Sequence, residues 1–367
     1  MLWVLPAPYI SLAGEFFVDM TVSINSAPSG SLPKQAIDGL IAEGHVMADT
    51  PFADGQVQPA SLDLRLGTKA YRLRASFLPG DRTVAQCLGG EDAGQLVMHE
   101  IDLTAGAVFE TGCVYLVPLQ ERLALPGGIS ARANPKSSTG RLDVFTRVIA
   151  DGADQFEAVP AGYHGPLYVE IAPRTFSVLA KTGEKLVQIR FRAGAADVLD
   201  SQTVSIDLKG DKAGSIIGWR ARRHSALVDL AGIGAHKAAQ YWEPLYAPGE
   251  WLILDPDEFY ILASKEAVQI PVDRAAEMAP IAPEIGEFRA HYAGFFDPGF
   301  GLDAAGGKGS RAVLEVRGRD VPFMLRHGQP VAKLDFEPLA AAPENLYGQN
   351  GSHYQAQGLR LSKHFKL

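Results

Sequence analysis

Cysteine is scarce in this sequence. Cys87 and Cys113 are the only two among 367 residues. Two cysteines are too few for a disulfide framework or for a zinc site built mainly from cysteine. Free thiols suit a reducing compartment, so we expect a cytoplasmic protein.

Long apolar runs and an excess of positive charge are missing as well. No apolar run reaches the roughly 18 residues that a membrane-spanning helix needs. The net charge is −8, because 42 Asp and Glu outnumber 34 Lys and Arg. The chain therefore offers no broad basic surface for nucleic acid. We expect neither a membrane nor a nucleic acid as partner, although a local basic pocket could still bind a small anion.

The N-terminal segment lacks the features of a signal peptide. It is apolar and aromatic, but it has no basic residue at its beginning and is interrupted by Glu15. We expect residues 1–29 to be a poorly ordered leader that precedes the folded domains.

Glycine and proline are abundant and divide the chain into short segments. There are 38 Gly and 24 Pro, in clusters such as 79–80 and 126–128. Short stretches of alternating apolar and polar residues lie between such clusters, which predicts the many short strands of a sandwich, barrel or jelly roll. One helix is expected after Ser31, the predicted cap, with Pro33 in its first turn and apolar residues at helical spacing up to Gly44.

The two halves of the chain repeat each other. Tyr115 recurs as Tyr260, Glu170 as Glu315 and Phe191 as Phe336, each 145 residues later. One fixed offset across several landmarks indicates internal duplication. We therefore predict two copies of one β domain, over 30–195 and 196–367.

Two stretches of the first copy suggest a binding site. Residues 136–142 (Lys-Ser-Ser-Thr-Gly-Arg-Leu) form a turn with hydroxyls, backbone N–H groups and cations, which a phosphate chain needs. Residues 162–165 form a tight glycine hairpin, followed by a strand that carries Glu170 in an apolar run. A carboxylate there is costly unless it is paired or functional. Taken alone, each stretch also has an ordinary structural explanation as a turn or a paired carboxylate.

These stretches resemble the dCTP deaminase branch of the dUTPase-like superfamily, in its longer bacterial form with two fused copies. Residues 136–142 match the family's Arg-Ser-Ser-x-x-Arg-Leu motif, with Lys136 in place of the first Arg. Residues 161–165 with Glu170 match its hairpin, and 297–301 with Glu315 match it more loosely. The tail, 354–358, resembles the family's closing segment. The resemblance implies a mainly β fold: tandem dUTPase-like domains, each a β-clip or distorted jelly-roll barrel with a few short helices.

The resemblance also implies an enzyme that converts dCTP and water to dUTP and ammonia, in the supply of the dTTP precursor. The His-x-Glu and Pro-Cys-x-x-Cys patterns of zinc deaminases are missing, so we expect a zinc-independent reaction with a glutamate as proton shuttle. The expected catalytic residues are Glu170, Ser137 and Arg141, with Glu315 as a structural relic or second base. Expected substrate-binding residues are Lys136, Ser138, Ala150, Tyr163, Gln188, Tyr347, Tyr354, Gln357 and Lys363. Mg²⁺ is expected on the phosphates, with no metal ligands from the protein.

Assembly and reaction each have alternatives. Sites in this superfamily form between neighbouring copies, so we expect a homotrimer in which first copies of different chains meet. The rival arrangement is a composite site within one chain that uses Glu315 and the tail. The alternative activities are a dUTP diphosphatase and a bifunctional enzyme that deaminates dCTP and hydrolyses dUTP. A further alternative is a non-catalytic nucleotide sensor.

Overall fold

The computed structural model describes residues 29–367 apart from 91–92, 213, 247–248, 282–283, 285–287, 292–293, 307–308 and 350–353. The predicted leader, 1–29, lies outside the described residues except for Ser29. In the sequence of the second copy, residues 282–287 (Ala-Pro-Glu-Ile-Gly-Glu) stand where the first copy has its Ser-Ser motif, and most of them also lie outside the described residues.

Two sheets form the first copy. One has the order β1 (Gly30–Ser31), β13 (Val187–Ala193), β8 (Ile129–Pro135), β10 (Ala158–Val159), and β3 (Leu62–Leu64) also pairs with β13. The other has the order β5 (Val97–Asp102), β4 (Lys69–Leu73), β7 (Val114–Ala124), β11 (His164–Pro173), β9 (Val144–Ala150), and β2 (Val46–Ala48) pairs with β7. The prediction of a mainly β fold is confirmed.

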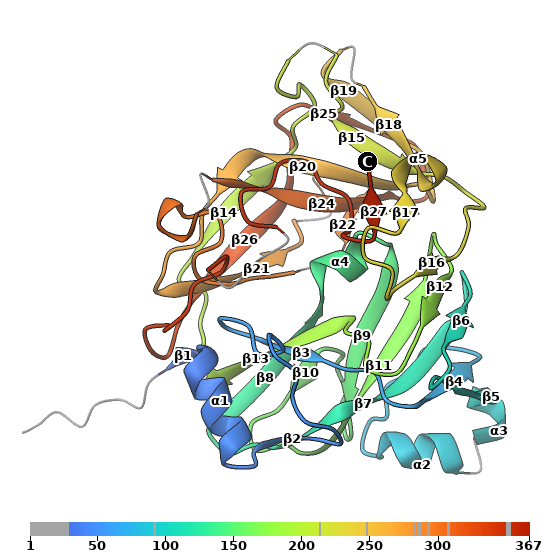
Figure 1. Cartoon of the computed structure of the whole chain (residues 1–367), viewed down its shortest axis with the longest axis vertical. Helices are drawn as coiled ribbons and strands as arrows, with labels where there is room; N and C mark the ends of the chain where they lie inside the picture. The colour runs from blue at the N-terminus through green and yellow to red at the C-terminus, as the bar shows by residue number, and fades with distance from the viewer. Residues whose placement is uncertain are drawn as a thin grey trace, which may run out of the picture.

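The second copy repeats both sheets in the same order. One runs β14 (Asp200–Ser205), β26 (Pro330–Pro338), β21 (Arg274–Ala279), β23 (Phe295–Phe296). The other runs β18 (Trp242–Leu245), β15 (Gly218–Ala221), β20 (Phe259–Val268), β24 (Ser310–Gly318), β22 (Phe288–His291). Strands β7 and β20 begin 145 residues apart, so the duplication read from the landmarks is a duplication of sheets (Figure 1).

Short elements connect and edge these sheets. The helices are α1 (Lys34–Ala42), α2 (Val84–Gly89), α3 (Ala93–Leu96), α4 (Ser137–Gly140) and α5 (Ala238–Tyr241), with a 3₁₀ turn η2 (Asp303–Ala305). The small sheets are β16 (Val228–Asp229) with β12 (Val178–Ala180) and β6 (Ala107–Phe109), β17 (His236–Lys237) with β27 (Phe365–Lys366), and β19 (Trp251–Leu254) with β25 (Phe323–Arg326). Within the described residues, no helix has the length and apolar character needed to cross a bilayer.

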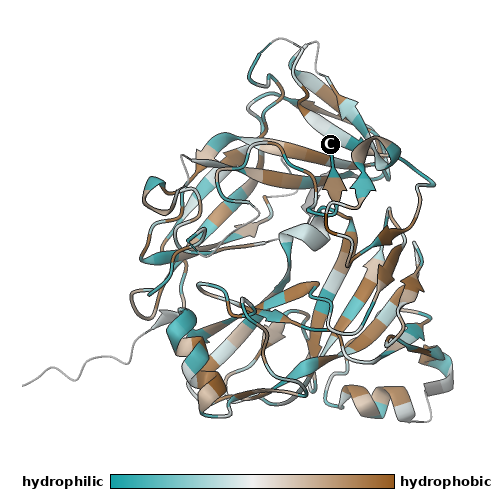
Figure 2. Cartoon of the chain, viewed as in Figure 1, coloured by the Kyte–Doolittle hydropathy of each residue, from teal (hydrophilic) through white to brown (hydrophobic). Residues whose placement is uncertain are grey.

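The two faces of strand β24 pack against different cores, and this contact places the second copy against the first. Leu314 and Val316 pack in the core of the second copy, whereas Val313 joins the core of the first. Since side chains alternate along a strand, Glu315 and Arg317 share the face of Val313. Figure 2 shows the same alternation of apolar and polar residues along the paired strands. The outer face of the β24 sheet therefore lies on the first copy, close to α4 (Figure 1).

A buried arginine joins the other two sheets. Arg190 on β13 is fully buried and donates to Glu337 Oε1 at 2.9 Å and to Asp297 Oδ1 at 3.1 Å. Ser31 donates its hydroxyl to the same Glu337 at 2.7 Å. The expected cap of α1 is therefore committed elsewhere: α1 begins after Pro33 and has no side-chain cap. A buried arginine with two carboxylates is a polar contact that fixes how the copies meet.

Candidate active site

Helix α4 carries the Ser-Ser motif to the junction of the two copies. It joins β8 in one sheet of the first copy to β9 in the other. Leu186 holds it in place, because the Leu186 carbonyl accepts from Lys136 N at 2.9 Å and from Thr139 Oγ1 at 2.8 Å. The motif thus forms one short helical turn whose hydroxyl face borders a pocket.

The pocket has a volume of about 1110 Å³, at the upper end of what small-ligand sites occupy. It is lined from both copies. Predicted residues that line it are Lys136, Ser137, Ser138, Gln188, Tyr347, Tyr354 and Lys363. The structure therefore brings together most of the motif and the tail at one cavity.

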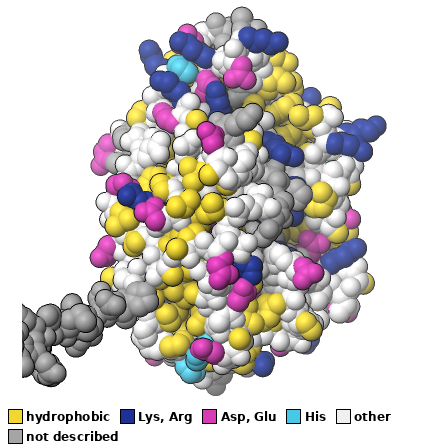
Figure 3. All heavy atoms as spheres, turned by 60° about the vertical axis from the view of Figure 1, so that its left-hand side comes forward, with side chains coloured by type: hydrophobic (Ala, Val, Ile, Leu, Met, Phe, Trp, Pro, Cys, Tyr) yellow, Lys and Arg dark blue, Asp and Glu magenta, His cyan; other side chains and the backbone are white. Residues whose placement is uncertain are grey.

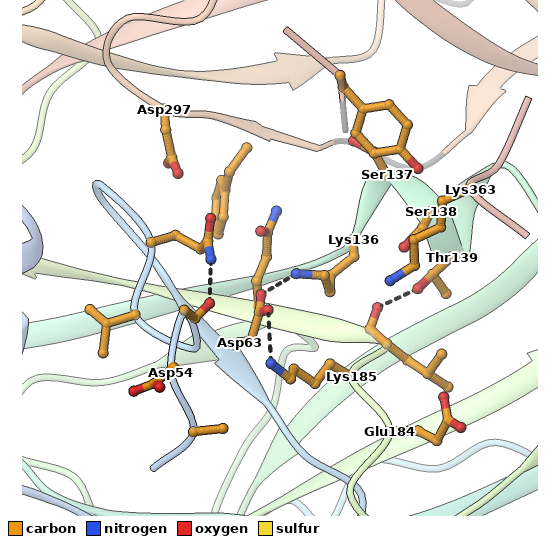
Figure 4. Close-up of a pocket in the computed structure, with 18 of the residues that line it drawn as sticks. Asp54, Asp63, Lys136, Ser137, Ser138, Thr139, Glu184, Lys185, Asp297 and Lys363 are labelled. Carbon is orange, nitrogen blue, oxygen red and sulfur yellow. Dashed lines mark hydrogen bonds and ion pairs between the residues drawn. The ribbon is translucent and has the colours of Figure 1, made fainter. Parts of the chain in front are cut away.

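Cations converge on one side of this pocket. Lys136 forms an ion pair with Asp63, and Lys185 Nζ lies 4.0 Å from the other oxygen of Asp63 (Figure 4). The pKa of Lys363 is lowered by burial and then by the neighbouring charge of Lys136. Several cations share one carboxylate here, so the site has positive charge to offer an anion. In contrast, on the face in Figure 3 the described Lys and Arg side chains are interspersed with Asp and Glu and form no continuous basic stripe.

A second cluster lies behind Tyr354 and joins the two copies. Arg141, at the end of α4, places Nε 3.8 Å from Glu315 Oε1 on β24. Both side chains are almost fully buried. Burial raises the pKa of Glu315 to about 8, although Arg141 opposes this shift. Tyr354 lines the pocket and its ring lies 4.1 Å from the Arg141 guanidinium, so it connects the pocket to this pair.

The C-terminal tail fixes Arg141 from the second copy. Arg141 donates to Gln357 Oε1 and to the carbonyl of Arg360, each at 3.1 Å. Ser362 donates to the Ser138 carbonyl at 2.8 Å, which ties the tail to α4. Strand β27 then pairs in parallel with β17. Gln357 itself does not line the pocket, and its contact is with the arginine rather than with the cavity.

Glu170 lies in a different environment from Glu315. Its Oε1 accepts from Arg147 at 2.6 Å, and the Arg147 guanidinium lies 3.7 Å from the Phe156 ring. Glu170 shares its face of β11 with Tyr168, which packs in a small separate core with Val84 of α2. It lies neither in the pocket lining nor in contact with Arg141. In this structure Arg141 therefore pairs with Glu315 of the second copy and not with Glu170.

Ala150 and Tyr163 also lie away from the pocket. Ala150 ends β9 and is buried in the core of the first copy. The Tyr163 hydroxyl donates to the Pro166 carbonyl at 2.6 Å and accepts from Asp151 N at 3.0 Å, which closes the hairpin. Both residues contribute to the fold of the first copy, and the pocket lies elsewhere.

Asp63, Lys185 and Asp297 were not predicted as site residues, yet they line the pocket. Burial raises the pKa of Asp297, while Arg190 opposes this shift. Asp63 lies on β3, and Asp297 lies in the second hairpin, 297–301, which the sequence singles out. Whether these two side chains face the same pocket depends on how the two copies dock, which the sequence does not reveal. Among the described residues, no three His, Cys, Asp or Glu gather in a way that could hold a metal ion.

Comparisons with known proteins agree on one family. Residues 28–195 match the model of the 2'-deoxycytidine 5'-triphosphate deaminase N-terminal domain, and 173–365 match that of its C-terminal domain. A solved structure, 2'-deoxycytidine 5'-triphosphate deaminase from Agrobacterium tumefaciens, is 52% identical with a TM-score of 0.82, and the match covers 88% of this chain and 98% of that one.

Shorter relatives match as well. The dCTP deaminase, dUMP-forming, of Beutenbergia cavernae is 31% identical over 41% of this chain and 73% of its own length. The dCTP deaminase, dUMP-forming, of Coprothermobacter proteolyticus is 26% identical over 48% of this chain and 89% of its own. Each match covers less than half of this chain, as a single copy of a duplicated domain would.

Proposed function

The chain belongs to the dCTP deaminase family, and from this premise we propose that its pocket binds dCTP and that the chain hydrolyses the bond between C4 of the cytosine and its amino group. The observation that supports the choice of residues is the contact between Arg141 of the first copy and Glu315 of the second. Water supplies the incoming oxygen, so dCTP and water give dUTP and ammonia.

Glu315 is proposed as the proton shuttle. A carboxyl whose pKa is about 8 both accepts and returns a proton near neutral pH. It takes a proton from water as the oxygen adds to C4, and a proton is delivered to the ring nitrogen N3. The amino group then gains a proton and leaves as ammonia while the C4 carbonyl forms. Arg141 balances the charge on Glu315, and Ser137 faces the pocket, where its hydroxyl can hold water or the amino group.

The phosphate chain is proposed to bind the cationic side of the pocket. Lys136 and Lys185 exchange part of their contact with Asp63 for phosphate oxygens. Ser138 and Lys363 line the same cavity close to Lys136 (Figure 4). Gln188 and Tyr347 are the remaining predicted contacts that line it, and we assign them to the sugar and its surroundings.

Replacing Lys363 by Met is expected to raise KM for dCTP about 10- to 100-fold, because a charge-assisted hydrogen bond is worth about 1.5–3 kcal/mol. Steady-state kinetics on dCTP measure the effect. Lys366→Met, on the exposed side of β27, is the matched control, because it removes the same charge from the same tail outside the pocket lining. Equal KM values for the two variants would remove Lys363 from the phosphate site.

Mg²⁺ is proposed to bind with the nucleotide. Bound to the phosphate oxygens it would offset their charge, and Asp63 and Asp297 are among the carboxylates in the pocket lining that could hold water molecules around it. Exhaustive EDTA treatment is expected to lower turnover, and Mg²⁺ alone to restore it. We propose that zinc is not required, and restoration by zinc but not by Mg²⁺ would contradict this.

Asp297 is the residue that bears on the bifunctional alternative. Its carboxylate lines the pocket from the second hairpin, and some relatives carry names that specify formation of dUMP. A carboxylate beside the phosphates could activate water for release of pyrophosphate. Its hydrogen bond to Arg190 holds it as a structural partner instead, so we favour dUTP as the product.

One assay separates the candidate functions. The protein is incubated with dCTP and, separately, with dUTP, and ammonia and pyrophosphate are both measured. We expect ammonia from dCTP and pyrophosphate from neither. Pyrophosphate from both substrates would establish the bifunctional alternative. Tight dCTP binding without either product would establish the sensor.

For the assembly we propose a homotrimer, as the resemblance implies. One chain already supplies Arg141 and Glu315, so the trimer is not needed to complete that pair. Light scattering of the purified protein checks the mass. We also propose a cytoplasmic location, where free Cys87 and Cys113 stay reduced, with nucleotides rather than nucleic acid as partners.

A further inference from the structure

A second ion pair runs beside the Arg141–Glu315 contact. Asp143 lies two residues after Arg141, and Arg317 lies two residues after Glu315 on β24. Asp143 Oδ2 accepts from Arg317 Nη2, so the two copies are joined by two neighbouring pairs of opposite polarity. In one pair the first copy supplies the cation, and in the other it supplies the anion.

The Asp143–Arg317 pair is buried and hydrogen-bonded to a neighbouring side chain. Asp143 is fully buried, and Thr175 donates to its Oδ2 at 2.5 Å while accepting from Arg317 at 2.9 Å. Asp143 also has φ of 54°, a left-handed conformation that costs most residues energy but that Asp and Asn tolerate. The chain therefore keeps an aspartate in this conformation, and its side-chain contacts with Arg317 and Thr175 help to offset the strain.

We propose that Asp143 and Arg317 are positioning residues for the deamination: their ion pair sets β24 against α4 and thereby holds Glu315 opposite Arg141. This inference rests on the proposed function. A slide of β24 by one residue would turn Glu315 to the opposite face of its sheet. The second pair resists such a slide, because Arg317 would lose Asp143 at the same time.

The charges around Glu315 can be named. Arg141 and Asp143 face it from the first copy, and Asp143 contributes to raising its pKa. Arg317 shares its strand, and Ile261 and His291 are its neighbours in register on β20 and β22. Because Asp143 and Arg317 neutralise each other, removing either one leaves a single uncompensated charge close to Glu315.

The test compares two variants that should shift the pH profile of kcat/KM in opposite directions. Asp143→Asn keeps the shape and the backbone conformation but leaves the Arg317 cation, so the limb of the pH profile of kcat/KM that follows Glu315 should move down by about one pH unit. Arg317→Gln leaves the Asp143 carboxylate, so the same limb should move up by a similar amount. The double variant should return it toward the wild-type position. Thr175→Val removes hydrogen bonds but no charge, and should leave the limb in place.

A readout independent of turnover completes the test. The free energy of unfolding of each variant is measured against pH, and the same variant carrying Glu315→Gln is subtracted. Because the folded-state pKa of Glu315 is raised from 4.5 to about 8, its contribution to stability is fully present below pH 4.5 and is lost as pH rises from there to about 8 in the wild type. Asp143→Asn should move the upper end of this loss to lower pH. An unmoved upper end in both charge variants would overturn the positioning role, whereas a moved upper end in a protein that fails to deaminate dCTP would overturn only the proposed function.

Discussion

Glu315→Gln is expected to lower kcat for dCTP by about 10²- to 10⁴-fold, the range that a proton-transferring side chain supplies. The amide has nearly the same shape but cannot accept and return a proton. Binding of dCTP should change little, because glutamine keeps the size of glutamate and the proposed phosphate contacts lie elsewhere in the pocket. Release of ammonia measures the first quantity, and calorimetric titration with dCTP the second.

Glu170→Gln is the matched control, since it makes the same change at the duplicated position. It removes a buried partner of Arg147, so the melting temperature should fall while kcat per folded molecule stays near the wild-type value. If Glu170→Gln lost turnover and Glu315→Gln kept it, the assignment of the pair would be reversed. In the wild type, kcat/KM should rise with pH toward about 8, as Glu315 loses its proton in the free enzyme.

Arg190→Met is expected to reduce the free energy of unfolding by about 3–5 kcal/mol, because it leaves the buried Asp297 without its cation and leaves Glu337 with Arg192 as its remaining ion-pair partner. Asp297 and Glu337 are both almost fully buried, and Arg190 accounts for one hydrogen bond to each. Methionine keeps much of the side-chain volume, so the loss is mainly electrostatic. Urea unfolding followed by fluorescence measures it.

Arg274→Met provides the comparison. Arg274 on β21 pairs with Asp200 at 2.8 Å, but both side chains are partly exposed to solvent. Such a pair contributes about 0–1 kcal/mol. A loss at Arg190 no larger than the loss at Arg274 would show that the buried contact does not hold the copies together.

The sequence predicts the architecture better than the site. The fixed offset between Tyr115 and Tyr260 identifies the duplication because strands keep their lengths while loops change. The glycine and proline clusters mark where strands end, because these residues interrupt the pairing of strands in a sheet. Ser31 shows the limit of local reading, since its hydroxyl binds Glu337, 306 residues away, in place of the helix end.

The choice between Glu170 and Glu315 could not be made from the sequence. Both follow a glycine hairpin in an apolar strand, and the first copy retains the fuller set of motifs. The observation that favours Glu315 is that the β24 face, not the β11 face, docks on α4. Arg147, opposite Glu170 in register, is the one signal in the sequence that could have marked that glutamate as paired.

In the mechanism we propose, one reaction centre is divided between two unlike halves of a polypeptide, and this has an evolutionary consequence. When identical copies meet, one sequence must supply both sides of the contact, so a substitution that improves one role can spoil the other. Here Ser137 and Glu315 belong to different halves, so each can change without a change in the other half. The segment at 282–287 could thus lose its hydroxyls and cations without loss of the centre that the first half serves.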